Sequence, residues 1–314
     1  MQATLAVKEI ATLRNGRMSL SEIVERFTQY CDVSERSMKT YSAGIRKFLL
    51  YLKAKGISNP TRETVIEYKK ELTATKSAST VALYLSSLRR FFTWCASEGL
   101  YEDITAGVKS PHIDTGHKKD CFTANQLKAI IGGIERNGLK GKRDYALFAL
   151  MSATGLRCVE VMRANVGDIR NVGGEYVLYV QGKGKSSKAD FVKLSGPVMA
   201  MLKEYLTARG HVSEDAPLFA SVSRRNFGGR MTTRSISRVC KTAMREAGFD
   251  SRRLTAHSLR HSAVTIALMA GLSLQDVSQF ARHSNISVTM IYSHDIERLK
   301  SRCESTISAA IFGA

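Results

Sequence analysis

The chain has 314 residues, enough for about two ordinary domains, and its 44% hydrophobic and 24% charged residues are typical of a soluble globular protein. Its 47 Lys and Arg residues outnumber 28 Asp and Glu, and the formal net charge of +19 favours a polyanionic partner over the alternative of a merely basic enzyme. The sequence has no apolar run of membrane-spanning length and no clean secretory signal, and its six cysteines are scattered singly; these features argue against membrane insertion, export, a disulfide framework and a zinc site, and favour the reducing cytoplasm and the nucleoid.

The first region is expected to be helical over residues 20–105, after an N-terminal extension of residues 1–19. Apolar side chains recur at helical spacing in three stretches, and Gly56 and Asn59-Pro60 punctuate the first two. The expected helices cover residues 37–55, 61–72 and 79–97. Basic side chains lie on the third helix or just before it: Lys76, Arg89 and Arg90. We therefore expect a small, basic helical domain.

Residues 106–120 are polar and lack apolar periodicity, which is typical of an exposed linker between domains. Lys109, Lys118 and Lys119 in this stretch either contact phosphates or are simply solvated. A second, larger domain is expected over residues 121–314. It begins with helices over residues 123–137 and 143–152, continues with two alternating strands, residues 175–181 and 189–194, and is helical again from Pro197.

Two candidate site residues precede or lie between the strands. Arg157, in Thr154-Gly155-Leu156-Arg157, opens a helix with Glu160 one turn on; the alternative is a surface Arg–Glu pair. Lys183 lies on the GKGKSSK turn, which resembles the end of an ATP-binding phosphate loop. Tyr179 occupies the position of the loop's first glycine, and the turn joins two strands rather than a strand and a helix, so ATP binding is rejected. Alone, Lys183 could be a solvated hairpin tip.

Further candidates follow in the helical part. His257 and Arg260 are three residues apart and share a helix face. His257 and His261 have the spacing of a zinc-protease helix, but Ser258 stands where that motif needs a glutamate, so no metal is expected. His283 precedes Tyr292 by nine residues. Taken alone, a tyrosine among Ile and Met is more often a half-buried core residue.

Together these residue types supply what transesterification at a phosphodiester requires. Bidentate guanidinium groups match the extra negative charge of a pentavalent phosphate. A phenol, with a pKa of about 10, needs nearby positive charge or a base to attack at neutral pH. A cationic acid must protonate the departing sugar oxygen. A phosphotyrosine would conserve the bond, so that religation needs neither ATP nor a metal cofactor.

In its motifs and their order, the chain resembles the tyrosine recombinase (phage integrase) family, with the layout of Xer-type recombinases and mobile-element integrases. The stretches concerned are ATGLRCVEV, GKGK, HSLRHS and RHSNISVTMIYSH. The resemblance is looser over residues 20–105, where STVALYLSSLRRFFTWCASEGL is similar to the family's core-binding domain. It implies a mainly α fold, with a helical, SAM-like core-binding domain and a mixed α/β catalytic domain that contains a small antiparallel sheet.

The resemblance also implies roles for individual residues. Arg157 and Arg260 would clamp the scissile phosphate, and His283 would hydrogen-bond it. Lys183 would protonate the 5′-hydroxyl leaving group, while His257 would assist proton transfer at the nucleophile, Tyr292, which forms a 3′-phosphotyrosyl link. Glu160 would hold neighbouring site residues. The sequence departs from the family at Ala281-Arg282, where Leu-Gly is frequent; Arg282 either adds a phosphate contact or is exposed.

The expected partner is double-stranded DNA with specific recombination sites. A basic stretch between Leu218 and the HSLRHS motif would neutralise phosphates. Its members are Arg224, Arg225, Arg230, Arg234, Arg238, Lys241, Arg245, Arg252 and Arg253. The C-terminal tail, apolar from Ile307 to Phe312, would dock on a neighbouring protomer and build a cyclic tetramer; alternatively it folds back on its own domain.

The expected activity is site-specific recombination through a Holliday junction, with integration or excision of a mobile element favoured. Accessory proteins and a partner recombinase remain open. Xer-type resolution of chromosome or plasmid dimers is the alternative role. A type IB topoisomerase, which shares the nucleophile chemistry, and a non-catalytic DNA-binding protein are the alternative classes.

Overall fold

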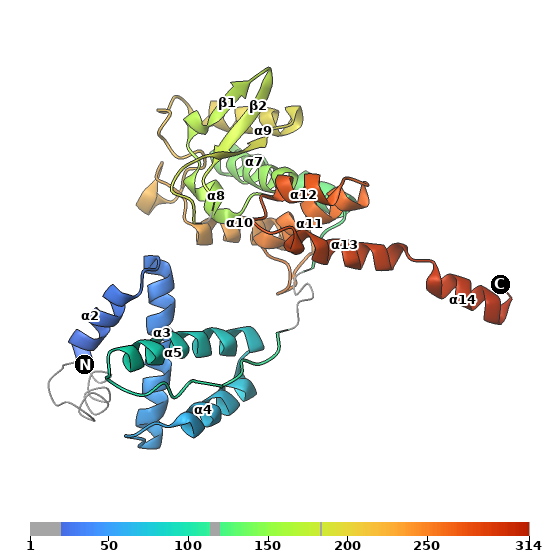
Figure 1. Cartoon of the computed structure of the whole chain (residues 1–314). Helices are drawn as coiled ribbons and strands as arrows, with labels where there is room; N and C mark the ends of the chain where they lie inside the picture. Colours follow the sequence, from blue (N-terminus) through green and yellow to red (C-terminus); the bar gives the residue numbers. More distant parts are fainter. Residues whose placement is uncertain (1–19, 114–119, 183, 314) are drawn as a thin grey trace. The chain divides into compact units, whose positions relative to one another are not determined.

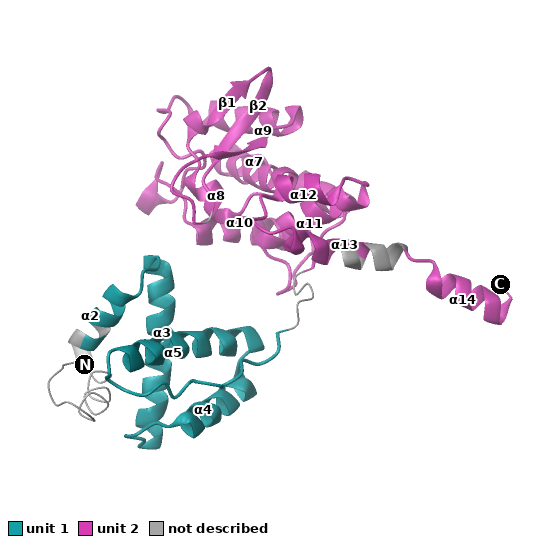
Figure 2. Ribbon diagram, in the orientation of Figure 1, with its two compact units in different colours: residues 1–114 teal, residues 115–314 magenta. Residues whose placement is uncertain are grey.

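The computed structural model describes residues 20–113, 120–182 and 184–313. It divides into two compact units, residues 1–114 and 115–314, and the division falls within residues 106–120 (Figures 1 and 2). Each unit has its own hydrophobic core. Within the described ranges, no helix combines the length and the apolar character needed to cross a membrane.

Unit 1 is helical throughout its described secondary structure. Its helices are α2 (Leu20–Tyr30), α3 (Glu35–Lys55), α4 (Arg62–Thr75) and α5 (Ala78–Ser97). Local signals set their ends: the Ser34 hydroxyl accepts a hydrogen bond from the Ser37 N–H at 3.3 Å, and Gly56 ends α3 in the left-handed conformation. The three helices expected from the sequence are confirmed, with ends shifted by a few residues.

Aromatic side chains fill the core of unit 1. Phe48 meets Phe92 and Tyr68 in edge-to-face contacts, and Phe27 packs on Trp94, which is 1% exposed. Helices α3 and α5 approach so closely at Gly44 that a Cβ there would lie 2.6 Å from the Ser87 hydroxyl oxygen. Gly44 therefore permits this helix contact.

Unit 2 is helical around one small sheet. Its first α-helices are α6 (Ala124–Gly133), α7 (Gly138–Thr154) and α8 (Cys158–Arg163). After the sheet come α9 (Gly196–Arg209), α10 (Thr233–Glu246), α11 (Ala256–Met269), α12 (Leu274–Ala281), α13 (Ser287–Lys300) and α14 (Cys303–Phe312). Unit 2 also contains two short 3-10 helices, Val166–Asp168 and Arg224–Asn226. The mainly α fold class is confirmed.

The sheet is antiparallel, in the order β1 (Ile169–Val172), β2 (Glu175–Val180) and β3 (Asp190–Lys193). The sequence predicted β2 and β3 but missed β1, because only Ile169 in β1 escapes exposure and the strand shows no apolar alternation. Helix α7 packs against α6, α9, α10 and α11, and from Ala146 to Thr154 every residue except Ala153 is buried. A second, smaller cluster joins α11, α12 and α13.

Candidate active site

The turn between α7 and α8 places Arg157. Helix α7 ends at Gly155, whose φ of +60° and whose closeness to the Phe280 ring (3.4 Å from a built Cβ) both favour glycine. Arg157 then starts α8. Its N–H donates to Glu160 Oε2 at 2.8 Å and its Nη1 donates to Glu160 Oε1 at 3.0 Å. Glu160 is fully buried, so the carboxylate is fixed and orients a partly exposed guanidinium.

Arg260, on α11, is fixed from two directions. Its Nη1 donates to the Gly155 carbonyl at 2.9 Å and its Nη2 donates to the Ala281 carbonyl. Burial, together with the neighbouring charges of Arg157 and Arg282, lowers the pKa of Arg260 to about 9. The group is therefore positively charged at neutral pH but destabilised by its surroundings, and an anion placed there would relieve that destabilisation.

His283 follows α12. Its Nδ1 lies 2.8 Å from the hydroxyl oxygen of buried Thr289 and is hydrogen-bonded to it, which fixes the ring. Burial lowers the pKa of His283 to about 4, and the charges of Arg260 and Arg157 add to the effect. The ring is consequently neutral at pH 7 in the free protein.

Tyr292 lies on α13, in the small cluster with α11 and α12, and is 6% exposed. Its hydroxyl is hydrogen-bonded to Nδ1 of His261, and the His257 ring meets the His261 ring edge-on, with centroids 4.6 Å apart. Burial raises the pKa of Tyr292 to about 12, while the charges of Arg260 and Arg157 oppose the rise. The phenol is therefore protonated and shielded, although cations lie within electrostatic reach.

His261 is the site residue that sequence reasoning missed. The sequence assigned proton transfer to His257 and considered His261 only as a metal ligand. The structure places His261 against the phenol and His257 on the outer side, where it is exposed. Their four-residue spacing did indicate a shared helix face, but not which ring reaches the neighbouring helix.

Lys183 lies outside the described residues, but the hairpin on either side of it is described. Arg163, at the end of α8, donates from Nη1 to the Gly182 carbonyl at 3.0 Å. Lys185 pairs with Asp190 at 2.7 Å, and the Gln181 amide donates to the Lys185 carbonyl at 2.8 Å. The base of the hairpin is thus tied to α8, the helix that follows Arg157.

Arg282 is not exposed, which removes one of the two alternatives expected for it. Its side chain is 10% exposed, and its Nη2 lies 3.3 Å from Glu160 Oε2. Two guanidinium groups, those of Arg157 and Arg282, thus contact the buried Glu160 carboxylate, and the third, that of Arg260, is held by the Gly155 and Ala281 carbonyls.

The basic residues expected to bind DNA fall into two groups. Lys76, Arg90, Arg225, Arg234 and Arg238 are exposed. Arg89 instead donates to the Val108 carbonyl at 2.8 Å, and Lys241 donates to the Ser251 carbonyl at 2.7 Å. Helix α10 carries Arg234, Arg238 and Lys241 at helical spacing, opposite its buried face.

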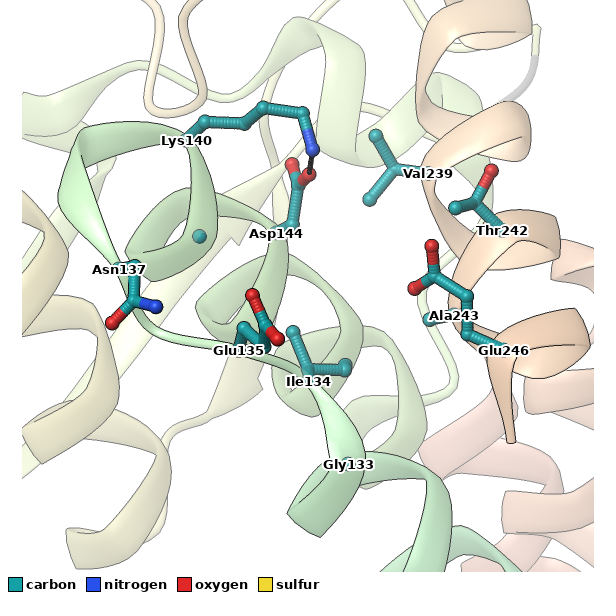
Figure 3. A pocket seen from close by; sticks show the side chains of 11 residues that line it. Gly133, Ile134, Glu135, Asn137, Lys140, Asp144, Val239, Thr242, Ala243 and Glu246 are labelled. Atoms are coloured by element: carbon teal, nitrogen blue, oxygen red, sulfur yellow. Dashed lines mark ion pairs between the residues drawn. The ribbon is translucent and has the colours of Figure 1, made fainter.

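A polar cavity of about 410 Å³ lies elsewhere on unit 2 (Figure 3). It is lined by the α6–α7 loop and by α10, at the end of α7 farthest from Gly155. Glu135, Asp144 and Glu246 face it, and Lys140 pairs with Asp144 at 3.3 Å. None of the candidate catalytic residues that the structure describes lines this cavity, so it is separate from the part of the site they form.

Comparison with known families and sequences agrees with this geometry. Residues 120–298 match the phage integrase family, and residues 21–99 match the N-terminal SAM-like domain of phage integrases. A tyrosine recombinase of Synechocystis sp. is 31% identical over 230 residues, 73% of this chain and 72% of that protein. The tyrosine recombinase XerD of Listeria monocytogenes is 27% identical over 286 residues, 88% of this chain and 94% of that protein.

Solved structures share the fold. The XerH site-specific recombinase, crystallised with its difH substrate before cleavage, gives a TM-score of 0.69 at 21% identity and covers 94% of this chain and 88% of that one. The Tn1549 transposon integrase, in complex with transposon right-end DNA, gives 0.67 at 14% identity and covers 90% of this chain and 100% of that one. At such low identity these likenesses concern the fold alone.

Proposed function

Because the chain belongs to the phage integrase family of tyrosine recombinases, and is a site-specific recombinase, we propose that Tyr292 is the nucleophile by which it cuts and rejoins DNA. One observation carries the assignment: the Tyr292 hydroxyl is hydrogen-bonded to Nδ1 of His261, on the helix α11 that also carries the buried Arg260. This hydrogen bond gives the phenol a proton acceptor that adjoins a buried guanidinium in sequence, as attack on a phosphodiester requires.

Arg157 and Arg260 bind the non-bridging oxygens of the scissile phosphate. Arg260 is fixed by two carbonyls and Arg157 by one carboxylate, so neither has to reorganise when the transition state forms. The ring of His283 is fixed by Thr289 and hydrogen-bonds the same phosphate. Binding of an anion raises the pKa of His283, because the negative charge offsets the neighbouring arginines.

The Tyr292 oxygen attacks phosphorus, and the bond from phosphorus to the 5′-oxygen breaks. The phenolic proton passes to His261, whose Nδ1 is already its hydrogen-bond partner, with His257 beside it. The leaving 5′-oxygen takes a proton from Lys183. Religation is the reverse, so the covalent 3′-phosphotyrosine needs neither ATP nor a metal.

Double-stranded DNA carrying recombination sites is the substrate and partner. The net charge of +19 and the exposed basic residues of α5, the Arg224–Asn226 turn and α10 supply the phosphate contacts. The proposed contacts are made by the exposed Lys76, Arg90, Arg225, Arg234 and Arg238. Arg89 and Lys241 would contact phosphates only after leaving their carbonyl partners. With DNA as substrate, the enzyme works in the cytoplasm at the nucleoid.

The assembly on DNA is proposed to be a tetramer linked through the C-terminal helix. Every residue of α14 is exposed, and Ile307, Ile311 and Phe312 are 58%, 65% and 77% exposed. A helix with this composition gains stability by burying its apolar side chains on a neighbour. Ile307→Asp with Ile311→Asp should leave the thermal unfolding of unit 2 unchanged while abolishing tetramers on DNA in light-scattering measurements. Tetramers that persist would exclude this linkage.

The nucleophile is tested by trapping the covalent intermediate. Duplexes that bind the full chain are selected from a random-sequence pool, and the cleavage position is mapped on them. They are then remade with a nick beside that position, so that the cut fragment diffuses away. Wild-type protein should yield an adduct that survives detergent and disappears with proteinase, with the nucleotide on Tyr292 by peptide mass spectrometry.

Tyr292→Phe should give no adduct, whereas Tyr176→Phe, which changes an exposed tyrosine of β2, should give a normal one. An adduct formed by Tyr292→Phe would refute the assignment.

The biological outcome is proposed to be integration or excision of a mobile element. Resolution of chromosome or plasmid dimers is the second candidate, because relatives such as the Listeria monocytogenes protein are named XerD. Recombination between two different selected sites would support integration, and recombination only between identical sites would support dimer resolution. Relaxation of a supercoiled plasmid without any site would instead indicate a topoisomerase. Omitting or adding host extract tests for accessory proteins or a partner recombinase.

A further inference from the structure

Arg282 has an unusual backbone. It ends α12 with φ 53° and ψ 47°, and among the described residues it is the only non-glycine with a positive φ. Its N–H donates to the Gln279 carbonyl at 2.9 Å, and the N–H of His283 donates to the Ser278 carbonyl at 3.1 Å. Glycine or asparagine is preferred at such a helix end, and a residue with a Cβ costs about 1 kcal/mol or more there. An arginine at this point calls for a compensating role.

The side chain of Arg282 turns inward instead of reaching solvent. Its Nη1 donates to the Phe280 carbonyl at 2.8 Å, and its Nη2 donates to Glu160 Oε2 at 3.3 Å. Its Nε is buried and has no hydrogen-bond partner within the described part of the chain. A long charged side chain normally keeps its charged end in water, so burying this guanidinium costs free energy. The ion pair with Glu160 offsets part of that cost, and its retention suggests a role.

Glu160 is shared by two arginines. Its Oε1 accepts from Arg157 Nη1, and its Oε2 accepts from Arg282 Nη2 as well as from the Arg157 N–H. With the side chain fully buried, the direction of the carboxylate depends on these contacts. Arg282 thereby connects the segment that carries His283 to the turn that carries Arg157.

We propose that Arg282 is a positioning residue: through Glu160 it holds Arg157 in the orientation that binds the scissile phosphate. The inference rests on the proposed function. Arg157 is the more open of the two, with its side chain 29% exposed against 10% for Arg282. The charge of Arg282 is already compensated by the Glu160 carboxylate, whereas the carbonyl partners of Arg260 are neutral and leave its charge available to a phosphate. The phosphate contact therefore belongs to Arg157, and Arg282 acts one step behind it.

Removing Arg282 leaves the buried carboxylate with a single cationic partner. Glu160 is then free to rotate toward Arg157, and this rotation misplaces the Arg157 guanidinium. A displacement of about 1 Å at a reacting centre costs up to about 100-fold in rate. We expect Arg282→Gly, which keeps the left-handed helix end and removes the guanidinium, to slow strand cleavage by about 10- to 100-fold.

The experiment measures adduct formation on the nicked substrate at saturating DNA, together with the half-saturating DNA concentration. Arg282→Gly should lower the rate constant while changing the half-saturation by less than about twofold, because the DNA-binding surface is intact. Arg282→Lys keeps the charge but not the two-pronged guanidinium group, so its rate constant should lie between those of the wild type and Arg282→Gly. Arg136→Ala is the control, since it removes an exposed arginine that pairs with Glu204 at 3.8 Å on the same unit.

A double-variant cycle identifies the route of the effect. In a Glu160→Gln background the link is already broken, so Arg282→Gly should cost less than about threefold more. A full, multiplicative loss there would show that Arg282 acts on the DNA directly and would overturn the proposal. So would wild-type cleavage by Arg282→Gly.

Chemical rescue separates a positioning role from a folding defect. Guanidinium ion at millimolar concentration should fit the space left by Arg282→Gly and restore part of the rate, but it should not help Arg282→Gly with Glu160→Gln. Absence of rescue in the single variant, or equal rescue in both, would contradict the proposal. Arg282→Asn, which also tolerates the left-handed conformation, provides a second variant if the glycine protein unfolds. An adduct formed by Tyr292→Phe would instead refute the assignment of Tyr292 as the nucleophile. That result is distinguishable from failure of the Arg282 proposal, because it concerns a different variant.

Discussion

The two units differ in where they keep their charged residues. In unit 1, the buried polar residues within the described range are the uncharged Thr64, Ser87 and Thr105. In unit 2, Arg143, Glu160, Asp168 and Arg260 are buried. Both units have hydrophobic cores with many fully buried side chains, so the contrast does not follow from poorer packing in unit 2.

This difference indicates which unit does chemistry and which presents a surface. A buried charge is costly and persists where partners compensate it and where function uses its field. In unit 2, two of these charges, Glu160 and Arg260, belong to the candidate site, whereas Arg143 pairs with Asp144 away from it. Unit 1 leaves its charges in solvent, where they can meet phosphates at little cost. Replacing a buried arginine of unit 2 and replacing an exposed arginine of unit 1 should therefore have very different effects.

The largest effect is expected for Arg260→Lys. The ammonium group keeps the charge but cannot reproduce the fork that bonds the Gly155 and Ala281 carbonyls while facing the phosphate. Adduct formation should slow by about 1,000-fold, as for loss of a fixed donor at a reacting oxyanion. Single-turnover cleavage of the nicked substrate measures this rate.

Arg143→Lys is the matched control, because Arg143 is also buried in unit 2 but pairs with Asp144 and the Ala220 carbonyl. It should lower thermal stability with little effect on cleavage. If Arg143→Lys cuts as slowly as Arg260→Lys, burial rather than site geometry explains the loss. Replacing the scissile phosphate with a neutral methylphosphonate should narrow the Arg260→Lys defect, since less charge then has to be neutralised.

The fold was largely predictable because its signals are local. Helical apolar spacing and residues such as Gly56 and Thr61 mark helices α3 to α5 close to their observed ends. Strand β1 was missed because it is exposed and lacks alternation. The expected helix over residues 123–137 was wrong at its end, residues 134–137, since α6 ends at Gly133, where two glycines weaken the helix.

The site was predictable in its residue types but not in its contacts. Motif order predicted that Arg157, Arg260, His283 and Tyr292 share one site, and their roles stay a prediction; in the structure, Arg260 bonds carbonyls two residues before Arg157 and His283. The partner of the phenol, His261, and the inward turn of Arg282 depend on how α11, α12 and α13 pack. No spacing within one helix encodes the distance to another helix, so tertiary contact had to supply this part.

The next largest effect is expected in unit 1, from Gly44→Ala. The added Cβ would lie 2.6 Å from the Ser87 hydroxyl oxygen and 2.7 Å from its Cβ, so α3 and α5 must separate. The loss should be about 1–2 kcal/mol, after the higher helix propensity of alanine has offset part of the strain. Urea unfolding followed by fluorescence of Trp94, the single tryptophan, measures the stability of unit 1.

Ser87→Gly in the same chain should restore most of the stability, since it exchanges the two side chains across one contact. Cleavage at saturating DNA should change little in either protein. If Gly44→Ala leaves the urea midpoint of Trp94 fluorescence unchanged, α3 and α5 accommodate the added methyl group, which would contradict the prediction.

A smaller, pH-dependent effect is expected from His283. Its pKa falls from an ordinary 6.5 to about 4 through burial and the neighbouring arginines. As pH falls from 6.5 toward 4, the unfolded chain takes up a proton that the folded protein resists, so stability is lost on acidification. At pH 5 the loss should be about 1 kcal/mol after discounting for partial exposure. His283→Gln should remove this part of the acid sensitivity in thermal melts at pH 7 and pH 5, and identical pH dependence in both proteins would contradict it.

The smallest effect separates two adjacent arginines of unit 1. Arg90 is exposed and lies over the Tyr30 ring, whereas Arg89 donates to the Val108 carbonyl and the Ser110 hydroxyl. Arg90→Ala should reduce the slope of log affinity against log salt by about 1, the value for one phosphate contact, and leave Trp94 unfolding nearly unchanged. Arg89→Ala should do the reverse, lowering the stability of unit 1 by about 1 kcal/mol with the salt slope intact. Titrations of a selected duplex at several salt concentrations decide between them. If Arg89→Ala also reduces the salt slope, the Arg89 guanidinium leaves the Val108 carbonyl and binds a phosphate in the complex. Arg89 would then belong to the DNA-binding surface of unit 1 together with Arg90.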